Sequence, residues 1–212
     1  MNSVLARPAL RLDHLAVVAR TLDEGCAHVT EQIGVEMGAG GTHPTMGTHN
    51  RLLSLGADRY LEVIAVDPVA DPPDRPRWFG LDRFDGEPQL ATWIVATDDI
   101  DTVLDDAHPA SGRATPLSRG NLRWTISIAD DGALPLDGAF PSLIEWPPGP
   151  HPAGLMKDAG CRLSSLVVEH PRAEEIESFV YGRLDETVEI EAGPAARLTA
   201  TFETPAGTRT LS

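Results

Sequence analysis

The feature of this sequence that most constrains its fold is an internal repeat in which a strand-like segment is followed by a helix-like one. Residues 12–19, LDHLAVVA, are mostly apolar and rich in valine, as in a buried strand, and residues 21–34, TLDEGCAHVTEQIG, follow with helical character. Residues 90–97, LATWIVAT, and 98–107, DDIDTVLDDA, repeat that order. A repeat of roughly 80 residues predicts two related modules.

Cap residues mark the two predicted helices. Thr21 precedes the first helix and Gly34 ends it, while Asp98 or Asp99 occupies the capping position of the second. A side-chain oxygen at the N-cap accepts a hydrogen bond from a free backbone N–H, and glycine readily adopts the left-handed conformation that closes a helix. The sequence therefore predicts a helix directly after the first strand of each module.

Further strand-like runs complete each module. They are HNRLLSLG and RYLEVIAV in the first module, and NLRWTISIAD and PSLIEWP in the second. Turn-rich stretches surround them, and we predict the order βαβββ for each module; the runs named here are two of the three strands after its helix. The first module covers residues 11–68 and the second 90–149, and a proline-rich linker without periodicity, residues 69–89, joins them.

The C-terminal residues 160–212 contain a further strand and helix pattern. CRLSSLVVEHP begins it, AEEIESFVYG follows as a helix, and the strand-like runs TVEIEAG, ARLTATFET and GTRTLS close it. We predict a third, shorter βαββ unit here. The expected fold class is therefore α+β, with repeated βαβββ modules and mixed sheets.

Charge and hydropathy narrow the classes of function. A net charge of −15 over 212 residues argues against a nucleic-acid partner, which needs a basic face. No apolar stretch approaches the roughly 18 residues that span a bilayer, and the N-terminus lacks the apolar core of a secretory signal, so we expect a cytoplasmic protein without a membrane partner. Cys26 and Cys161 are too few for a disulfide framework and are expected to be reduced.

Two polar residues interrupt the apolar strands of the first module. Strand alternation places His14 on one face with Leu12 and Ala16, and it places Glu62 amid the apolar residues of RYLEVIAV. An ionised carboxylate in such a strand needs a metal, a cation or a hydrogen-bond donor. The alternative is structural, with His14 as a hydrogen-bonded core histidine and Glu62 paired with an arginine such as Arg51.

The second module repeats this pattern in part. Placing PSLIEWP beneath RYLEVIAV sets Glu145 at the position of Glu62, and placing LATWIVAT beneath LDHLAVVA sets Thr92 at the position of His14. His14, Glu62 and Glu145 are therefore candidate ligands for a divalent metal, Zn²⁺, Ni²⁺, Co²⁺, Mn²⁺ or Fe²⁺, in an open site. Alternatively, Glu145 is an edge residue or the partner of an arginine such as Arg123.

A glycine-rich loop and the tryptophans supply the candidates for substrate contacts. His49 and Asn50 follow GTHPTMGT and either recognise a ligand or satisfy local backbone groups in a turn. Trp78, Trp93 and Trp124 either line an apolar cavity or belong to the core. The other histidines are expected in the turn, for His43, or at the surface, for His28, His108, His151 and His170.

Signatures of several other enzyme classes do not occur in the sequence. It contains no G-x-S-x-G, no P-loop, no G-x-G-x-x-G after a strand and no H-E-x-x-H. The run GAGGT precedes a strand rather than opening a helix, so it does not predict a phosphate site. Hydrolase and nucleotide-binding functions therefore lose support.

The segments LDHLAVVARTLDEG, HPTMGTHNRLLSLG, RYLEVIAVDP and RPRWFGLD resemble the glyoxalase-like domain branch of the vicinal oxygen chelate superfamily, most closely over residues 11–83. The resemblance implies a half-barrel cup with helices outside, and metal ligands from the first and last strands of each module. His14, Glu62 and Glu145 match three ligand positions. Thr92 departs from the pattern, which implies water or His49 as the fourth ligand, or loss of the metal site.

The superfamily includes glyoxalases, extradiol dioxygenases, epimerases and resistance proteins, some of which bind ligands without metal or catalysis. With one clear histidine, lyase or isomerase chemistry follows more readily than dioxygenation. We expect a metal-dependent lyase or isomerase that acts on a small oxygenated molecule, with Glu62, Glu145 or His49 as the catalytic base. The alternative is a non-catalytic small-molecule-binding protein, and a homodimer is expected in either case.

Overall fold

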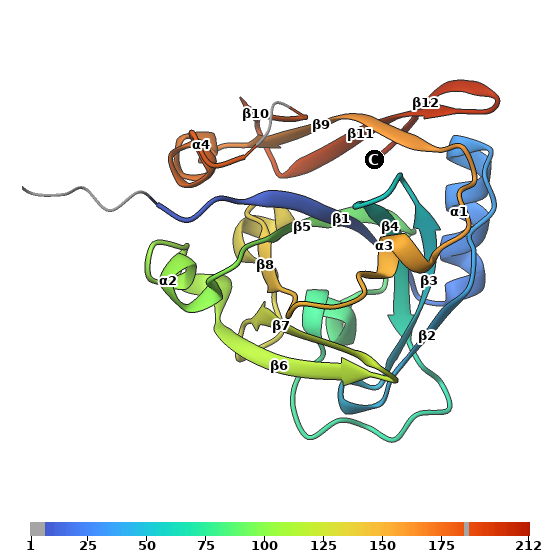
Figure 1. Cartoon of the computed structure of the whole chain (residues 1–212), viewed down its shortest axis with the longest axis horizontal. Coiled ribbons are helices and arrows are strands. Elements are labelled where there is room, and N and C mark those ends of the chain that lie inside the picture. The colour runs from blue at the N-terminus through green and yellow to red at the C-terminus, as the bar shows by residue number, and fades with distance from the viewer. Residues whose placement is uncertain (1–6, 185–186) are drawn as a thin grey trace, which may run out of the picture.

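The computed structural model describes residues 7–184 and 187–212, whose path is shown in Figure 1. Residues 1–6, on which part of the expectation about a secretory signal depends, lie outside these ranges. The first module consists of β1 (Arg11–Val18), α1 (Leu22–Ile33), β2 (Gly40–His43), the 3₁₀ turn η1 (Pro44–Met46), β3 (Thr48–Ser54) and β4 (Tyr60–Val66). The linker contains η2 (Trp78–Arg83).

The second module has the same order of strands and helix. It consists of β5 (Gln89–Ala96), α2 (Ile100–Asp105), η3 (Pro109–Ser111), β6 (Arg113–Arg119), β7 (Leu122–Ile128), η4 (Pro135–Gly138) and β8 (Ser142–Glu145). In each module the first strand runs parallel to the last, β1 beside β4 and β5 beside β8. The modules meet where β1 and β5 pair antiparallel.

All eight of these strands form one mixed sheet with the order β2-β3-β4-β1-β5-β8-β7-β6. The sheet curls into a half-barrel, and Figure 1 shows its strands around a central opening with α1 and α2 outside the ring. The predicted α+β half-barrel with external helices is therefore confirmed. No helix of the described residues is long and apolar enough to cross a membrane.

The helix ends follow the cap residues in the sequence. The Thr21 side chain accepts a hydrogen bond from the Glu24 backbone N–H, and Gly34 closes α1 with a φ of 70°. At α2 the second of the two candidate aspartates, Asp99, accepts from the Thr102 backbone N–H. These contacts satisfy backbone groups that helix ends otherwise leave free, so the helices begin and end where predicted.

The strands of the C-terminal segment form a second sheet. The segment contains α3 (Pro152–Leu155), β9 (Arg162–His170), α4 (Ala173–Val180), β10 (Val188–Ala192), β11 (Arg197–Thr204) and β12 (Gly207–Leu211). The sheet order is β10-β9-β11-β12, and the three strand-like runs expected after the helix are β10, β11 and β12, one strand more than the βαββ order states. Because β10 lies directly beside β9, this order also differs from that of the first module, in which β2 is at the far edge.

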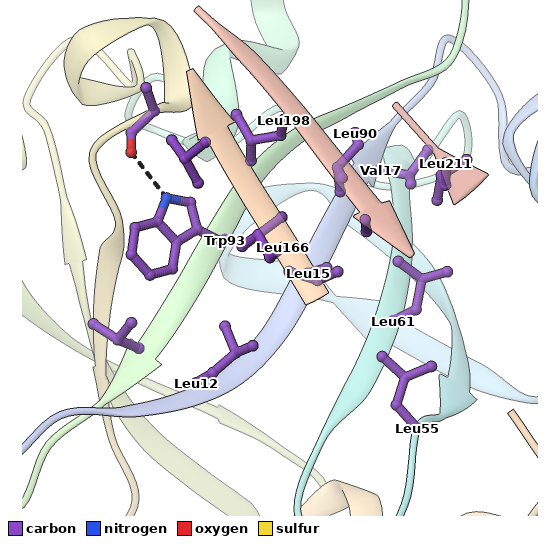
Figure 2. Close-up of a cluster of buried hydrophobic side chains, with 14 of the residues drawn as sticks. Leu12, Leu15, Val17, Leu55, Leu61, Leu90, Trp93, Leu166, Leu198 and Leu211 are labelled. Carbon is purple, nitrogen blue, oxygen red and sulfur yellow. Dashed lines mark hydrogen bonds between the residues drawn. The ribbon is translucent and has the colours of Figure 1, made fainter. Parts of the chain in front are cut away.

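The second sheet covers the outer face of the half-barrel. Leu166 of β9 and Leu198 of β11 are buried in one cluster with Leu15, Leu61 and Trp93 of the large sheet, as Figure 2 shows. Burial of these side chains removes the outer face of β1, β4 and β5 from water. The inner face of the half-barrel is therefore the surface on which these strands present polar groups.

Candidate functional site

A β-bulge near the start of β1 places two adjacent polar side chains in the interior. Leu12 pairs with Val95 and His14 pairs with Ile94, so Asp13 is an extra residue on its strand. The bulge interrupts the alternation that was expected to put Leu12 on the face of His14, and Leu12 belongs instead to the outer core. Both Asp13 and His14 are buried.

Asp13 accepts hydrogen bonds from three side chains. Its Oδ1 lies 2.6 Å from His14 Nδ1, and its Oδ2 accepts from Trp146 Nε1 at 2.9 Å and His151 Nε2 at 3.0 Å. Burial alone would raise the pKa of Asp13, but the hydrogen bonds from His14 and His151 lower this pKa to about 2. Asp13 is thus ionised at neutral pH, and His14 donates from Nδ1. The Nε2 atom of His14 is left for other partners.

Glu62 lies beside His14 on the inner face. Its Oε2 is 3.7 Å from His14 Nε2, and its Oε1 accepts a hydrogen bond from Asn50 Nδ2 at 2.6 Å. Asn50, rather than Arg51, is therefore the partner of this carboxylate. Only 6% of Glu62 is exposed, so the amide donor helps to stabilise a charge that burial penalises.

The three side chains form a row, carboxylate, imidazole and carboxylate, which we call the Asp13–His14–Glu62 row. Tyr60 packs on it, with its ring stacked on the His14 ring at 4.3 Å between centroids. Burial, followed by the nearby charges of Asp13 and Glu62, raises the pKa of Tyr60, so its hydroxyl stays protonated. The stacked ring restricts the orientation of His14 from one side.

Arg119 crosses from β6 to the opposite edge of the half-barrel. Its Nη1 donates to Asn50 Oδ1 at 2.9 Å and lies 3.3 Å from His43 Nε2. A Cβ atom on Gly41 would come within 2.9 Å of Arg119 Cδ, so glycine at this position of β2 leaves room for the arginine stem. Through Arg119 the two edge strands, β2 and β6, meet.

His43 is buried beside Arg119, although a turn position was expected for it. Its Nδ1 lies 3.1 Å from Thr48 Oγ1. Burial, and then the charge of Arg119, lower the pKa of His43 to about 3, so the ring is neutral and its Nε2 accepts from Arg119. In the described residues, Arg119 has only neutral hydrogen-bond partners and no carboxylate within ion-pair distance.

These residues surround a small cavity on the inner face. Its volume is about 30 Å³, which corresponds to one or two water molecules. The polar residues that line it are His14, His43, Asn50, Tyr60, Glu62 and Arg119. The structure thus brings together five of the predicted residues, His14, Asn50, Glu62, Trp78 and Trp124.

Aromatic side chains form much of the remaining wall, namely Trp78, Phe79, Trp124 and Trp146. Trp124 was among the expected lining residues, and Trp78 and Phe79 come from η2 of the linker. Phe79 is buried with a φ of 56°, a conformation rare for an aromatic residue and often found at functional sites. The buried Trp78 Nε1 has no hydrogen-bond partner in the described residues.

Glu145 lies elsewhere, which corrects its alignment with Glu62. In the first module, Glu62 of β4 is the strand partner of Ala16 of β1. In the second module, the residue of β5 that corresponds to Ala16 is Ile94. The β8 residue opposite Ile94 is Ser142, three positions before Glu145. Glu145 accepts a hydrogen bond from the Ile100 N–H at the start of α2, at 2.8 Å, and serves as a helix cap.

Two further expectations are corrected. His49 faces away from the cavity, because side chains along β3 alternate between the two faces of the sheet and its neighbour Asn50 points inward. The strand partner of His49 is Ala65, which belongs to the outer core. Trp93 also belongs to the outer core, where its indole N–H donates to the Ala139 carbonyl at 2.9 Å. Neither residue lines the inner cavity.

The residues at the site do not fit the predicted divalent metal. The second module offers Thr92 and Ser142 at the positions that correspond to His14 and Glu62, and neither is a usual ligand for these ions. Only His14 and Glu62 converge, whereas an open metal site commonly has three protein ligands. Within residues 7–184 and 187–212, no group of three His, Cys, Asp or Glu side chains is arranged to hold a metal.

The sequence model of the glyoxalase-like domain family matches residues 12–181, which include both modules. The chain belongs to this family. The glyoxalase-like domain is a branch of the vicinal oxygen chelate superfamily, so the resemblance seen in the first module extends through the second. Comparison with curated protein sequences finds no significant match.

Several solved structures are similar to this glyoxalase-like chain at low sequence identity. A hypothetical protein from Staphylococcus aureus has a TM-score of 0.59 at 13% identity, over 89% of this chain and 88% of its own. Methylmalonyl-CoA epimerase from Mycobacterium tuberculosis has a TM-score of 0.43 at 16% identity, over 70% and 95%. A methylmalonyl-CoA epimerase with methylmalonyl-CoA and NH₄⁺ has a TM-score of 0.43 at 17% identity, over 68% and 99%. At these TM-scores, the similarity to the epimerases does not indicate the substrate of this chain.

Sequence reasoning missed several residues of this glyoxalase-like site. Asp13 carried a signal, because two consecutive polar residues, Asp13 and His14, in an otherwise apolar strand indicate a bulge. Trp146 and His151 follow the last strand of the second module and reach Asp13 across more than a hundred residues of sequence. No local pattern identifies Arg119, which reaches the site only because the half-barrel closes.

Proposed function

We propose that this protein catalyses proton transfer at a carbon atom next to a carbonyl group of a small oxygenated molecule, as in an isomerase or lyase. The observation that carries the proposal is the Asp13–His14–Glu62 row, in which His14 and Glu62 line the inner cavity and Asp13 lies behind His14. A general base must be held within reach of the proton that it removes, and Asp13 holds His14 through Nδ1. The row is therefore suited to acid–base chemistry.

In the proposed reaction His14 Nε2 removes a proton from the substrate carbon. The electron pair of the C–H bond moves onto the carbonyl oxygen and gives an enolate, while Asp13 stabilises the imidazolium without touching the substrate. His14 Nε2 passes the proton to Glu62 Oε2 or keeps it, and one of the two then returns a proton to the enolate carbon, which restores the carbonyl. In a lyase the enolate electrons instead form a carbon–carbon double bond to the adjacent carbon, whose leaving group departs with its bonding pair and takes up the proton.

Stabilisation of the enolate is assigned to groups of this chain, because the expected metal ligands are incomplete. Arg119 lines the cavity and supplies a positive charge there. A donor that is already fixed in place stabilises developing negative charge more than freely reorienting water does. The predicted Glu145 and His49 take no part, since both lie outside the cavity.

The test is solvent deuterium exchange in D₂O, followed by proton NMR on 2-oxobutanoate and longer 2-oxo acids. We expect wild-type protein to accelerate exchange of the C3 protons, His14→Asn to abolish the acceleration, and His49→Asn to leave it unchanged. The matched control removes an imidazole that does not line the cavity. Exchange at the uncatalysed rate for every 2-oxo acid, or equal rates in the two variants, would contradict the proposal.

A second candidate function is non-catalytic binding of a small molecule. The observation in its favour is the aromatic wall of the cavity, with Trp124 and Trp146 in contact at 5.7 Å between ring centroids. Such a wall suits an apolar or aromatic ligand. Ligand binding that changes tryptophan fluorescence, combined with deuterium exchange at the uncatalysed rate, would favour this function over catalysis.

A further inference from the structure

A larger groove adjoins the inner cavity. It has a volume of about 610 Å³ and lies between residues 36–40, after α1, and the segment 152–159 that includes α3. Leu52, Arg119 and Leu122 line both the cavity and the groove. The two spaces are therefore neighbours, and Arg119 lines both of them.

The cavity and the groove differ so much in volume that they would hold different parts of a substrate. The cavity of about 30 Å³ has room for about two water molecules, since roughly 10–15 Å³ is enough to hold one. The groove lies within the range of small-molecule sites, roughly 300–1,000 Å³. Only the reacting end of a substrate fits beside the Asp13–His14–Glu62 row, and the rest has room in the groove.

The groove is lined by apolar side chains on both sides and by the charged residues Glu36, Arg119, Lys157 and Asp158. Met37 and Leu53 line it on the side of the half-barrel, and Leu155 and Met156 line it on the side of α3. Leu155 is 67% exposed, one of three large apolar side chains so exposed in the described residues. Unbranched methionine side chains adapt to ligands of varied shape. This lining suits a flexible apolar chain.

The charge at the junction favours an anion. The Arg119 guanidinium contacts Asn50 and His43, which both line the cavity, and both partners are neutral. In the described residues it has no carboxylate within ion-pair distance. A partly buried arginine of this kind is suited to hold a carboxylate, to which it can donate two parallel hydrogen bonds.

We infer that the substrate is an amphipathic carboxylate, whose carboxylate binds Arg119, a residue that lines both spaces, and whose apolar chain lies in the groove against Leu155 and Met156. This inference rests on the proposed proton transfer, because it names the substrate class for that site. The binding of the carboxylate itself is nevertheless measurable without turnover.

The experiment measures binding of straight-chain carboxylates of four to twelve carbons by tryptophan fluorescence, with 1-alkanols of equal length for comparison. Affinity is expected to rise roughly fourfold for each added methylene group until the groove is filled. Carboxylates should bind at least about tenfold more tightly than the matching alkanols. Equal affinity for both series, or no dependence on chain length, would overturn the inference.

Two variants test the contact with the carboxylate and the contact with the apolar chain separately. Arg119→Gln should weaken carboxylate binding about tenfold and leave alkanol binding unchanged, whereas Leu155→Ser should reduce the gain per methylene. Arg123→Gln is the matched control, because it removes a positive charge from the neighbouring strand β7 at a residue that lines neither space. Carboxylate binding by Arg119→Gln at wild-type affinity would refute the contact between Arg119 and the carboxylate.

Lys157 allows a measurement on the unmodified sequence, since it is the single lysine of the chain and lines the groove. Decanoate should slow acetylation of Lys157 by an N-hydroxysuccinimide ester, whereas acetate should not, with the α-amino group as internal reference. Equal rates with decanoate and acetate would count against occupation of the groove. If carboxylates bind as described but no 2-oxo acid exchanges deuterium, the proposed function fails and the groove assignment stands. If 2-oxo acids exchange deuterium but carboxylate affinity does not depend on chain length, the groove assignment fails and the proposed function stands.

Discussion

Lowering the pH from 7 to 5 should destabilise the fold through His43. Burial, and then the charge of Arg119, lower the pKa of His43 from 6.5 to about 3. At pH 5 its ring is therefore neutral in the folded state and protonated in the unfolded state. Each pH unit below 6.5 costs about 1.4 kcal/mol, so the free energy of unfolding should fall by about 2 kcal/mol between pH 7 and pH 5.

The assay is urea unfolding at both pH values for wild-type protein and His43→Gln. Glutamine Oε1 can still accept a hydrogen bond from Arg119 but does not titrate. Asp13, with its pKa lowered from 3.8 to about 2, adds its stability above pH 3.8 and loses it only as the pH falls toward 2, so it contributes little in this range. The wild type should lose about 2 kcal/mol more than the variant. Equal losses would refute the reasoning.

Three further predictions concern single side chains. Asp13→Asn should lower deuterium exchange at least about a hundredfold while 2-oxo acid binding persists, measured by NMR and fluorescence; unchanged exchange would remove Asp13 from the mechanism. Glu145→Ala should cost about 1 kcal/mol in urea unfolding, through loss of the α2 cap, and leave exchange unchanged; a loss of exchange would restore Glu145 to the site. Trp93→Phe should cost about 2 kcal/mol and preserve the fluorescence response to carboxylates, since Trp93 lies in the outer core; a lost response would contradict that position.

The repeated order of elements could be predicted because local patterns encode it. Thr21, Gly34 and Asp99 act as caps in the structure as in the sequence, and the strand-like runs become strands. The order of the second sheet could not be derived in this way. Its placement depends on which apolar faces remain uncovered after the half-barrel forms, as with Leu166 and Leu198 against the outer core.

The candidate site was only partly predictable. His14 and Glu62 stand out because a polar residue in an apolar strand needs a partner, and the structure places them 3.7 Å apart. Glu145 was misplaced because weak repeats can be aligned with a shift of several residues, and strand register alone identifies Ser142 as the counterpart of Glu62. Contacts across the half-barrel, such as that of Arg119, depend on closure of the sheet and leave no local signal.

The central claim is that the Asp13–His14–Glu62 row transfers protons with groups supplied by the chain itself. The most direct measurement is deuterium exchange of a 2-oxo acid by protein treated with a chelator, compared with His14→Asn under the same conditions. We predict that exchange persists after chelation and is lost in His14→Asn. Exchange that disappears with the chelator and returns with a divalent metal, or exchange by His14→Asn at the wild-type rate, would contradict the account.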